Sequence, residues 1–220
     1  MIEVLASGPL TTVQDAGRVG FAGLGVPRSG AFDRAAFRLA NRLVGNIEAA
    51  PALELTAGGL EFLARDAVTV ALTGAPCPGL DWGQPITLPA GATVRLGGAS
   101  AGLRSYLAVR GGVDVDPVLR SRSTDLLSGI GPAPLRPGDR IAIGIAVGGD
   151  VPGATELAPP SPASAHLVRV VLGPRADWFA ADATDALTAT PWTVRSDSNR
   201  VGIRLEAIAA RARSLLGGEL

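Results

Sequence analysis

Short runs of branched or alternating apolar residues dominate the first two thirds of the chain. Gly, Pro or Asp bounds each run, and these residues end strands and form turns. The pattern predicts β-strands at residues 2–6, 52–56, 68–73, 93–96, 105–109 and 140–145. The strands predicted at 93–96 and 140–145 each follow closely after a proline and begin at a glycine-containing turn, a pattern typical of barrel corners.

One segment has helical rather than alternating periodicity. Its apolar residues recur at spacings of three and four and share one face: Ala36, Phe37, Ala40, Leu43 and Val44. This predicts a helix over residues 33–44, capped by Asp33 and ended by Gly45. Asp33 therefore has two interpretations, a helix cap or a catalytic carboxylate, and the pattern favours the cap.

The pattern changes at residues 148–165, which consist mainly of Gly, Pro, Ala and Ser. This composition is typical of a linker, so we expect a first domain over residues 1–147 and a second over residues 166–220. Within the second we expect a strand at 166–172, a short helix at 180–189 and a strand at 192–195. So short a segment lies near the lower size limit for a self-sufficient domain.

Composition and charge exclude several classes of partner. Hydrophobic residues make up 47% of the 220 residues, and 20 basic residues balance 20 acidic ones. A net charge of zero provides no electrostatic reason to expect nucleic acid or a membrane surface as a partner. The first residues lack a secretion-signal pattern, and no apolar run is long enough to span a bilayer. We expect a cytoplasmic protein.

All basic residues are arginine, and the chain contains no lysine. This excludes a Schiff-base lysine, a phosphate-loop lysine and a lysine that carries biotin. Cys77 and His166 are each single, so neither an internal disulfide nor a structural zinc site is expected. We interpret His166 as structural and Cys77 as a turn thiol, and we predict no metal site.

Three clusters combine arginine with hydroxyl, amide or carboxylate groups. They are Gln14, Asp15 and Arg18 with Ser29 and Asp33; residues 120–125, which include Arg122 and Ser123; and residues 196–206, which include Asp197, Asn199, Arg200 and Arg204. Arginine can grip a carboxylate or phosphate with two parallel hydrogen bonds. Each cluster alone is also compatible with an ordinary solvated turn.

Taken in order, these stretches resemble one family. The match runs through Thr11-Thr12-Val13-Gln14-Asp15-x-Gly17-Arg18, Gly25-Val26-x-x-Ser29-Gly30-Ala31-x-Asp33, Ala40-Asn41-x-Leu43-Val44-Gly45-Asn46 and Leu53-Glu54-x-Thr56, and continues at residues 121–125, 173–179 and 196–205. It is similar to the family of 5-oxoprolinase C subunits, known in older naming as allophanate hydrolase subunit 2, which is related to biotin-dependent carboxyltransferases.

The resemblance implies an all-β fold with a few short helices, arranged as two cyclophilin-like β-barrel subdomains. Family members continue past the equivalent of Leu220, so we expect the second barrel to be incomplete in this chain. An incomplete barrel exposes strand edges, which would make the 220-residue chain prone to associate.

The resemblance also implies a function. The chain would be one component of a bacterial ATP-dependent 5-oxoprolinase, a hydrolase that opens the ring of 5-oxoproline to give glutamate and is active only with two partners, a homologous B subunit and an A subunit. ATP with magnesium would be used by the assembled complex, the substrate would be a small amide, and this chain would carry no biotin. Two alternatives stay open: a carboxyltransferase component that acts on urea or a similar amide with biotin supplied by another chain, and a non-catalytic regulatory partner of a kinase-inhibitor-like B subunit.

Motif matches assign expected roles to the residues of the three clusters. Such chemistry needs donors for an oxygen that develops charge and carboxylates that move protons. The expected catalytic residues are Asp15, Arg18, Asp33 and Asp197. The expected substrate-binding residues are Gln14, Ser29, Arg122, Ser123, Asn199, Arg200 and Arg204.

Overall fold

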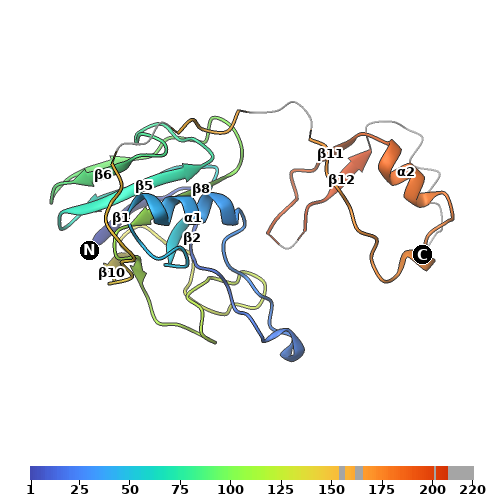
Figure 1. The fold of residues 1–220 in the computed structure, drawn as a ribbon, viewed down its shortest axis with the longest axis horizontal. Coiled ribbons are helices and arrows are strands. Elements are labelled where there is room, and N and C mark those ends of the chain that lie inside the picture. The colour runs from blue at the N-terminus through green and yellow to red at the C-terminus, as the bar shows by residue number, and fades with distance from the viewer. Residues whose placement is uncertain (154–156, 162–165, 201, 208–220) are drawn as a thin grey trace. The chain divides into compact units, whose positions relative to one another are not determined.

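The computed structural model describes residues 1–153, 157–161, 166–200 and 202–207, and the chain divides into two units (Figure 1). Unit 1 is Met1–Pro162 and unit 2 is Ala163–Leu220. Two sheets and one long helix make up most of unit 1, and a short helix and a two-stranded sheet belong to unit 2.

The first sheet of unit 1 has five antiparallel strands in the order β7-β4-β1-β10-β9. Their bounds are Thr93–Arg95, Leu60–Ala64, Ile2–Ser7, Arg140–Ile143 and Val113–Asp114. Along β1, Ile2 and Val4 are fully buried, while Glu3 between them faces outward and pairs with Arg65. This alternation is what a sheet with one solvated face requires.

The second sheet has the order β2-β3-β8-β5-β6, again antiparallel throughout. Its strands are Leu10–Gln14, Ala52–Thr56, Arg104–Val109, Val68–Gly74 and Pro85–Leu88. Leu72 and Leu107 belong to the core cluster shared with the first sheet, whereas Ala71 and Ala108 belong to a second cluster that includes the long helix. Burial on both faces explains the continuous apolar runs at residues 70–72 in β5 and 107–109 in β8.

Helix α1, Arg34–Leu43, lies on the second sheet (Figure 1). Phe37, Ala40 and Leu43 are buried, and the Phe37 ring meets the Tyr106 ring edge-on with centroids 6.1 Å apart. The side chain of Asp33 accepts a hydrogen bond from the backbone N of Ala36 at 3.0 Å. The predicted helix and its cap are both confirmed.

All six strands predicted within residues 1–147 are present, as β1, β3, β5, β7, β8 and β10. The prediction missed β2, β4, β6 and β9. In β2 the polar Thr11, Thr12 and Gln14 are almost completely buried, so its sequence has no polar–apolar alternation to detect. β6 begins with a proline, which is a poor strand signal.

Unit 2 agrees only partly with prediction. Its elements are the short 3₁₀-helix η2 (Ala176–Trp178), α2 (Ala183–Ala189), β11 (Trp192–Val194) and β12 (Leu205–Ala207). The predicted helix and second strand are confirmed with shorter bounds. The predicted strand at 166–172 is wrong: these residues form no strand, and Leu167 and Val171 are almost fully exposed. An alternating sequence becomes a strand only where a neighbour pairs with it.

The all-β class, with a few short helices, is confirmed. Within the described ranges, no helix is both long and apolar enough to cross a membrane. The same residues contain no group of three or more His, Cys, Asp or Glu side chains arranged to hold a metal ion. Cys77, expected in a turn, is buried in the core beside Ser105, with 3.2 Å between its Sγ and Ser105 Oγ.

Candidate functional site

Asp15 joins the end of β2 to a segment more than one hundred residues later in the chain. Its Oδ1 accepts hydrogen bonds from Ser121 Oγ at 2.7 Å, Ser123 Oγ at 2.5 Å and the Gly17 backbone N at 2.7 Å. Its Oδ2 accepts from the Arg122 backbone N at 2.6 Å. The tertiary structure thus unites the first two predicted clusters around one carboxylate.

Arg18 lies inside the protein rather than at its surface. Only 2% of the residue is exposed, and its guanidinium donates to the carbonyl oxygens of Val118 at 3.2 Å and Ser123 at 2.5 Å. No ion pair involves Arg18 among the described residues. Burying a cation without a carboxylate partner costs free energy unless hydrogen bonds compensate for the lost hydration. In Arg18 the compensating hydrogen bonds go to backbone carbonyl oxygens. These hydrogen bonds connect Arg18 to the segment of residues 118–123.

Three buried polar atoms in the described part of the chain lack a hydrogen-bond partner, and all belong to this region: Gln14 Oε1, Arg18 Nη1 and Thr124 Oγ1. The amide nitrogen of Gln14 donates to Thr12 Oγ1 and to the Thr124 carbonyl. Each unsatisfied buried group costs roughly 1–3 kcal/mol. Proteins keep such costs chiefly at functional sites, which supports a functional role for this region.

The glycines of the opening motif allow two chain segments to cross. A Cβ on Gly17 would lie 2.6 Å from the Arg28 carbonyl oxygen, and one on Gly30 would lie 2.8 Å from the Gly17 nitrogen. The Arg18 N–H donates to the Arg28 carbonyl at 2.6 Å, and the Ala31 N–H donates to the Asp15 carbonyl at 2.9 Å. The loop of residues 16–30 is closed at its base by these contacts.

Ser29 and Arg122 are also held by this network. Ser29 has a φ of +55°, which is uncommon for a residue other than glycine, and its Oγ donates to Asp125 Oδ2 at 2.9 Å. The Arg122 side chain donates through Nε to the Val115 carbonyl at 2.7 Å. Both residues therefore shape the site, and the Nε of Arg122 is hydrogen-bonded to the protein backbone.

Asp125 has a lowered pKa. Burial by itself would raise the pKa, but hydrogen bonds from the Ser128 backbone N, Ser29 Oγ and the Leu127 backbone N outweigh it. These donors stabilise the charged carboxylate. Asp125 therefore remains ionised and keeps its hold on Ser29.

A buried network under the start of α1 escaped the sequence analysis. Tyr106 donates its hydroxyl proton to Glu54 Oε2 at 2.8 Å and accepts from the Asp33 backbone N at 2.7 Å, while the Phe32 N–H donates to the same Glu54 oxygen at 2.9 Å. Burial, followed by the Glu54 carboxylate, raises the pKa of Tyr106, so its hydroxyl stays protonated. Glu54 was visible in the sequence within the Leu53-Glu54-x-Thr56 motif, but nothing there indicated its role.

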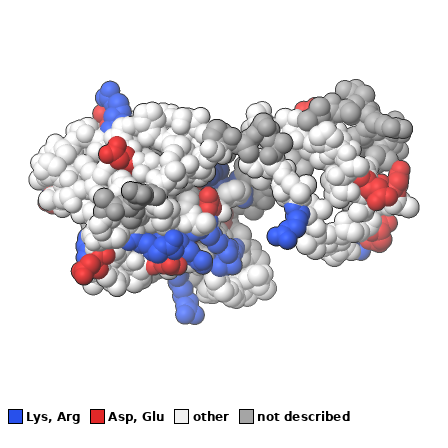
Figure 2. Space-filling model, turned by 45° about the horizontal axis from the view of Figure 1, so that its top comes forward, with Lys and Arg blue, Asp and Glu red and all other residues white. Residues whose placement is uncertain are grey.

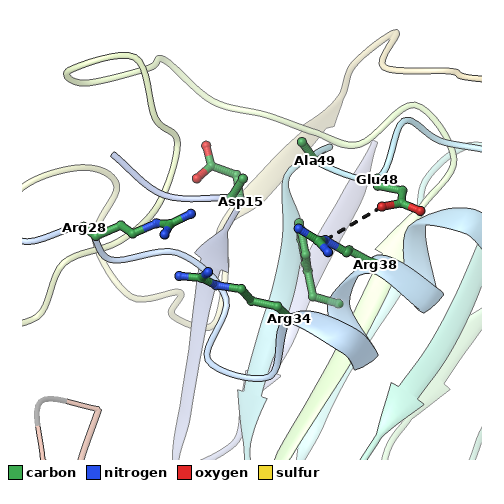
Figure 3. A pocket seen from close by; sticks show the side chains of 8 residues that line it. Asp15, Arg28, Arg34, Arg38, Glu48 and Ala49 are labelled. Atoms are coloured by element: carbon green, nitrogen blue, oxygen red, sulfur yellow. Dashed lines mark ion pairs between the residues drawn. The ribbon is translucent and has the colours of Figure 1, made fainter. Parts of the chain in front are cut away.

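Beside Asp15 lies a cavity of about 190 Å³ (Figure 3). Its charged lining comes from the end of β2, the 16–30 loop, α1 and the turn that follows α1: Asp15, Arg28, Arg34, Arg38 and Glu48. The guanidinium groups of Arg28 and Arg34 point toward each other below Asp15, whereas Arg38 turns toward Glu48. Figure 2 shows arginines gathered in a band on one face of unit 1. The sequence analysis missed Arg28 and Arg34; the one available signal was the position of Arg34 and Arg38 on the polar side of the predicted helix.

The remaining predicted site residues lie in unit 2, around the turn between β11 and β12. Asp197 pairs with Arg195 at 3.0 Å, and the hydrogen bond from Arg195 is the main cause that lowers the Asp197 pKa. Arg204 donates to the Asp197 carbonyl at 2.6 Å, and Asn199 Oδ1 accepts from the Gly202 N–H at 3.2 Å. Arg200 belongs to the same turn.

The structure therefore brings together six predicted residues in unit 1: Gln14, Asp15, Arg18, Ser29, Arg122 and Ser123. Asp33 caps α1 and directly precedes Arg34, a residue of the cavity. The four others form the turn of unit 2. Of the side chains that line the cavity, Asp15 alone was predicted.

Comparisons with known proteins agree on one family. The model of the carboxyltransferase domain, subdomain A and B, matches residues 24–218. The C subunit of the 5-oxoprolinase of Escherichia coli (strain K12) is 41% identical over 217 residues, which cover 94% of this chain and 68% of that protein. The urea amidolyase of Lachancea kluyveri is 37% identical over 226 residues, which cover 92% of this chain and 12% of that protein.

A solved structure supports the same relationship. The crystal structure of the K. lactis urea amidolyase matches with a TM-score of 0.74 at 32% identity, and the match covers 93% of this chain and 14% of that one. The chain thus corresponds to most of the E. coli relative and to a small part of each urea amidolyase.

Proposed function

Because the chain belongs to the carboxyltransferase domain family, subdomains A and B, we propose that it is the C subunit of an ATP-dependent 5-oxoprolinase. Together with the A and B subunits it opens 5-oxoproline to glutamate. The observation that carries this proposal is the 41% identity to the C subunit of the E. coli 5-oxoprolinase across 94% of the chain. The name of that relative also supports the expectation of partner subunits.

The network around Asp15 supports a site at the end of β2. Opening a lactam ring places negative charge on the carbonyl oxygen, and fixed donors must stabilise it. Asp15, Ser123 and the Nε and Nη2 groups of Arg18 position the loop, whereas Arg18 Nη1 has no partner among the described residues. Arg28 and Arg34, whose side chains have no hydrogen-bond partner among the described residues, are also available to a ligand.

ATP and magnesium are used by the assembled complex. The chain has no lysine, so any phosphate that it contacts is held by arginine or backbone N–H groups. In unit 2, Asp197, Asn199, Arg200 and Arg204 remain candidates for contacts with the substrate. In this proposal the protein is cytoplasmic, and this chain carries no biotin.

The test is reconstitution. Purified chain is mixed with the A and B subunits, and ADP and glutamate are measured with and without 5-oxoproline. We expect both products to form in equal amounts, and only when all three proteins and 5-oxoproline are present. Complex formation without any 5-oxoproline-dependent ATP hydrolysis would refute the proposal.

A second candidate function has its own support. The 37% identity to the L. kluyveri urea amidolyase favours a carboxyltransferase component that moves a carboxyl group from carboxybiotin to urea or a similar amide. Because the chain has no lysine, biotin would have to arrive on another protein. Consumption of carboxybiotin on a separate carrier, dependent on urea and on this chain, would select this function over the first.

A further inference from the structure

The cavity beside Asp15 is lined by two exposed arginines that have no carboxylate partner among the described residues. Arg28 and Arg34 form no ion pair and no side-chain hydrogen bond among the described residues, yet their guanidinium groups face each other (Figure 3). Two cations repel each other, and an anion that contacts both would replace this repulsion with attraction. We infer that Arg28 and Arg34 bind the carboxylate group of a small substrate in this cavity.

The two carboxylates that line the cavity, Asp15 and Glu48, do not pair with Arg28 or Arg34. Glu48 is shared by two other arginines, with 2.9 Å between its Oε1 and Arg42 Nη1 and 3.7 Å between its Oε2 and Arg38 Nε. Asp15 is only 9% exposed, and four donors from the protein already address its oxygens. Neither carboxylate of the lining forms an ion pair with Arg28 or Arg34, and both arginines are exposed and accessible to a ligand.

The backbone of Arg28 is fixed in place before any ligand arrives. Its carbonyl accepts from the Arg18 N–H at 2.6 Å, and the next residue, Ser29, donates to Asp125. The absence of a side chain on Gly17 permits this close approach. A side chain that extends from an anchored backbone loses less entropy on binding than one on a free loop.

Arg34 is anchored from the opposite side. It is the first residue of α1, and Asp33 before it caps the helix and donates its backbone N–H to the buried Tyr106 hydroxyl. Tyr106 is held in turn by Glu54. The hydrogen bonds that join Glu54, Tyr106 and Asp33 therefore fix the position from which Arg34 extends into the cavity.

Size and geometry indicate the chemical class of the ligand. A volume of about 190 Å³ is below the range of pockets for drug-sized molecules, so the cavity suits a small molecule. Guanidinium groups bind planar carboxylates with paired hydrogen bonds. The identity of the substrate, 5-oxoproline with its single carboxylate, rests on the proposed function, whereas the presence of an anion site does not.

The test measures binding to the full 220-residue chain by calorimetry. The probes are 5-oxoproline, 2-pyrrolidinone, which is the same ring without the carboxylate, and inorganic phosphate. The variants are Arg28→Gln and Arg34→Gln. Arg140→Gln is the matched control, because Arg140 is an exposed arginine on β10 that contacts Glu3 and does not line the cavity. Thermal unfolding of each variant verifies that it folds as the parent does.

We expect 5-oxoproline to bind, 2-pyrrolidinone to bind at least about tenfold more weakly, and each cavity variant to lose about tenfold or more in affinity for 5-oxoproline. The Arg140→Gln variant should bind as the parent does. In the complex with the A and B subunits, the cavity variants should raise KM for 5-oxoproline.

Three results would overturn the inference. They are equal affinity for the two ring compounds, unchanged affinity in both cavity variants, and tighter binding of inorganic phosphate than of 5-oxoproline. Normal turnover by the complex with unchanged KM in both variants would refute the inference and leave the proposed function intact. Loss of the proposed function would instead show as no turnover by the parent complex, whatever the chain binds alone.

Discussion

At the scale of single residues, two carboxylates hold the site together by accepting hydrogen bonds from protein groups. Asp15 collects four hydrogen bonds and Asp125 collects three, and together they connect residues 15–29 to residues 121–128. A carboxylate that accepts several donors stabilises a loop strongly while it is charged. The stability of this loop should therefore depend on pH.

Asp125→Asn tests this dependence. The folded-state pKa of Asp125 lies below its unfolded value, so its stabilising effect is present above the unfolded pKa of about 3.9 and disappears as the pH falls through the folded pKa. We expect the variant to be less stable than the parent by about 1–3 kcal/mol at pH 7, and the difference to shrink below pH of about 3.9. Urea unfolding of both proteins at several pH values measures it. A difference that stays constant from neutral to acidic pH would contradict this account.

At the scale of elements, α1 connects the buried core to the cavity. One face packs Phe37 and Ala40 onto the second sheet, while Arg34 and Arg38 on another face line the cavity. The helix begins at a defined residue because Asp33 caps it. The cap therefore determines both the stability of the helix and the starting point of Arg34.

Replacement of the cap separates the two interpretations of Asp33. We expect Asp33→Ala to lower the free energy of unfolding by about 1 kcal/mol, and Asp33→Asn to change it little, because asparagine caps helices as well as aspartate does. Urea unfolding provides both values. Equal stability of the alanine variant and the parent would show that the cap contributes nothing. If the stable asparagine variant lost turnover in the reconstituted complex, the carboxylate would have a catalytic role as well.

At the scale of the whole molecule, both hydrophobic clusters lie within unit 1. Among the described residues, no member of either cluster comes after Ile143, and the helix that covers the second sheet belongs to the same unit. A segment of this size can bury enough surface to fold by itself. We therefore expect residues 1–162, expressed alone, to unfold in one cooperative transition near that of the complete chain. Circular dichroism during heating tests this, and a gradual loss of signal would show that unit 1 needs unit 2.

Sequence reasoning succeeded where short-range rules decide the structure. The strands β1 and β3 and the helix α1 were predictable, because periodicity and turn residues act within a few positions. The strand predicted at 166–172 failed for the opposite reason: its pattern is right, but no neighbouring strand pairs with it in the described residues. β2 was missed because its polar residues are buried by distant parts of the chain.

The same division applies to the site. Residue identity and local spacing were sufficient to predict the family resemblance, the cap at Asp33 and the all-β class. Long-range packing, by contrast, sets which arginines lie inside the protein and which line the cavity. Arg18 is buried by Val118 and Ser123, about one hundred residues away, whereas Arg28 and Arg34 face the cavity. Whether a residue is buried or lines a cavity depends on packing between segments that are distant in the sequence. No local sequence pattern encodes this packing.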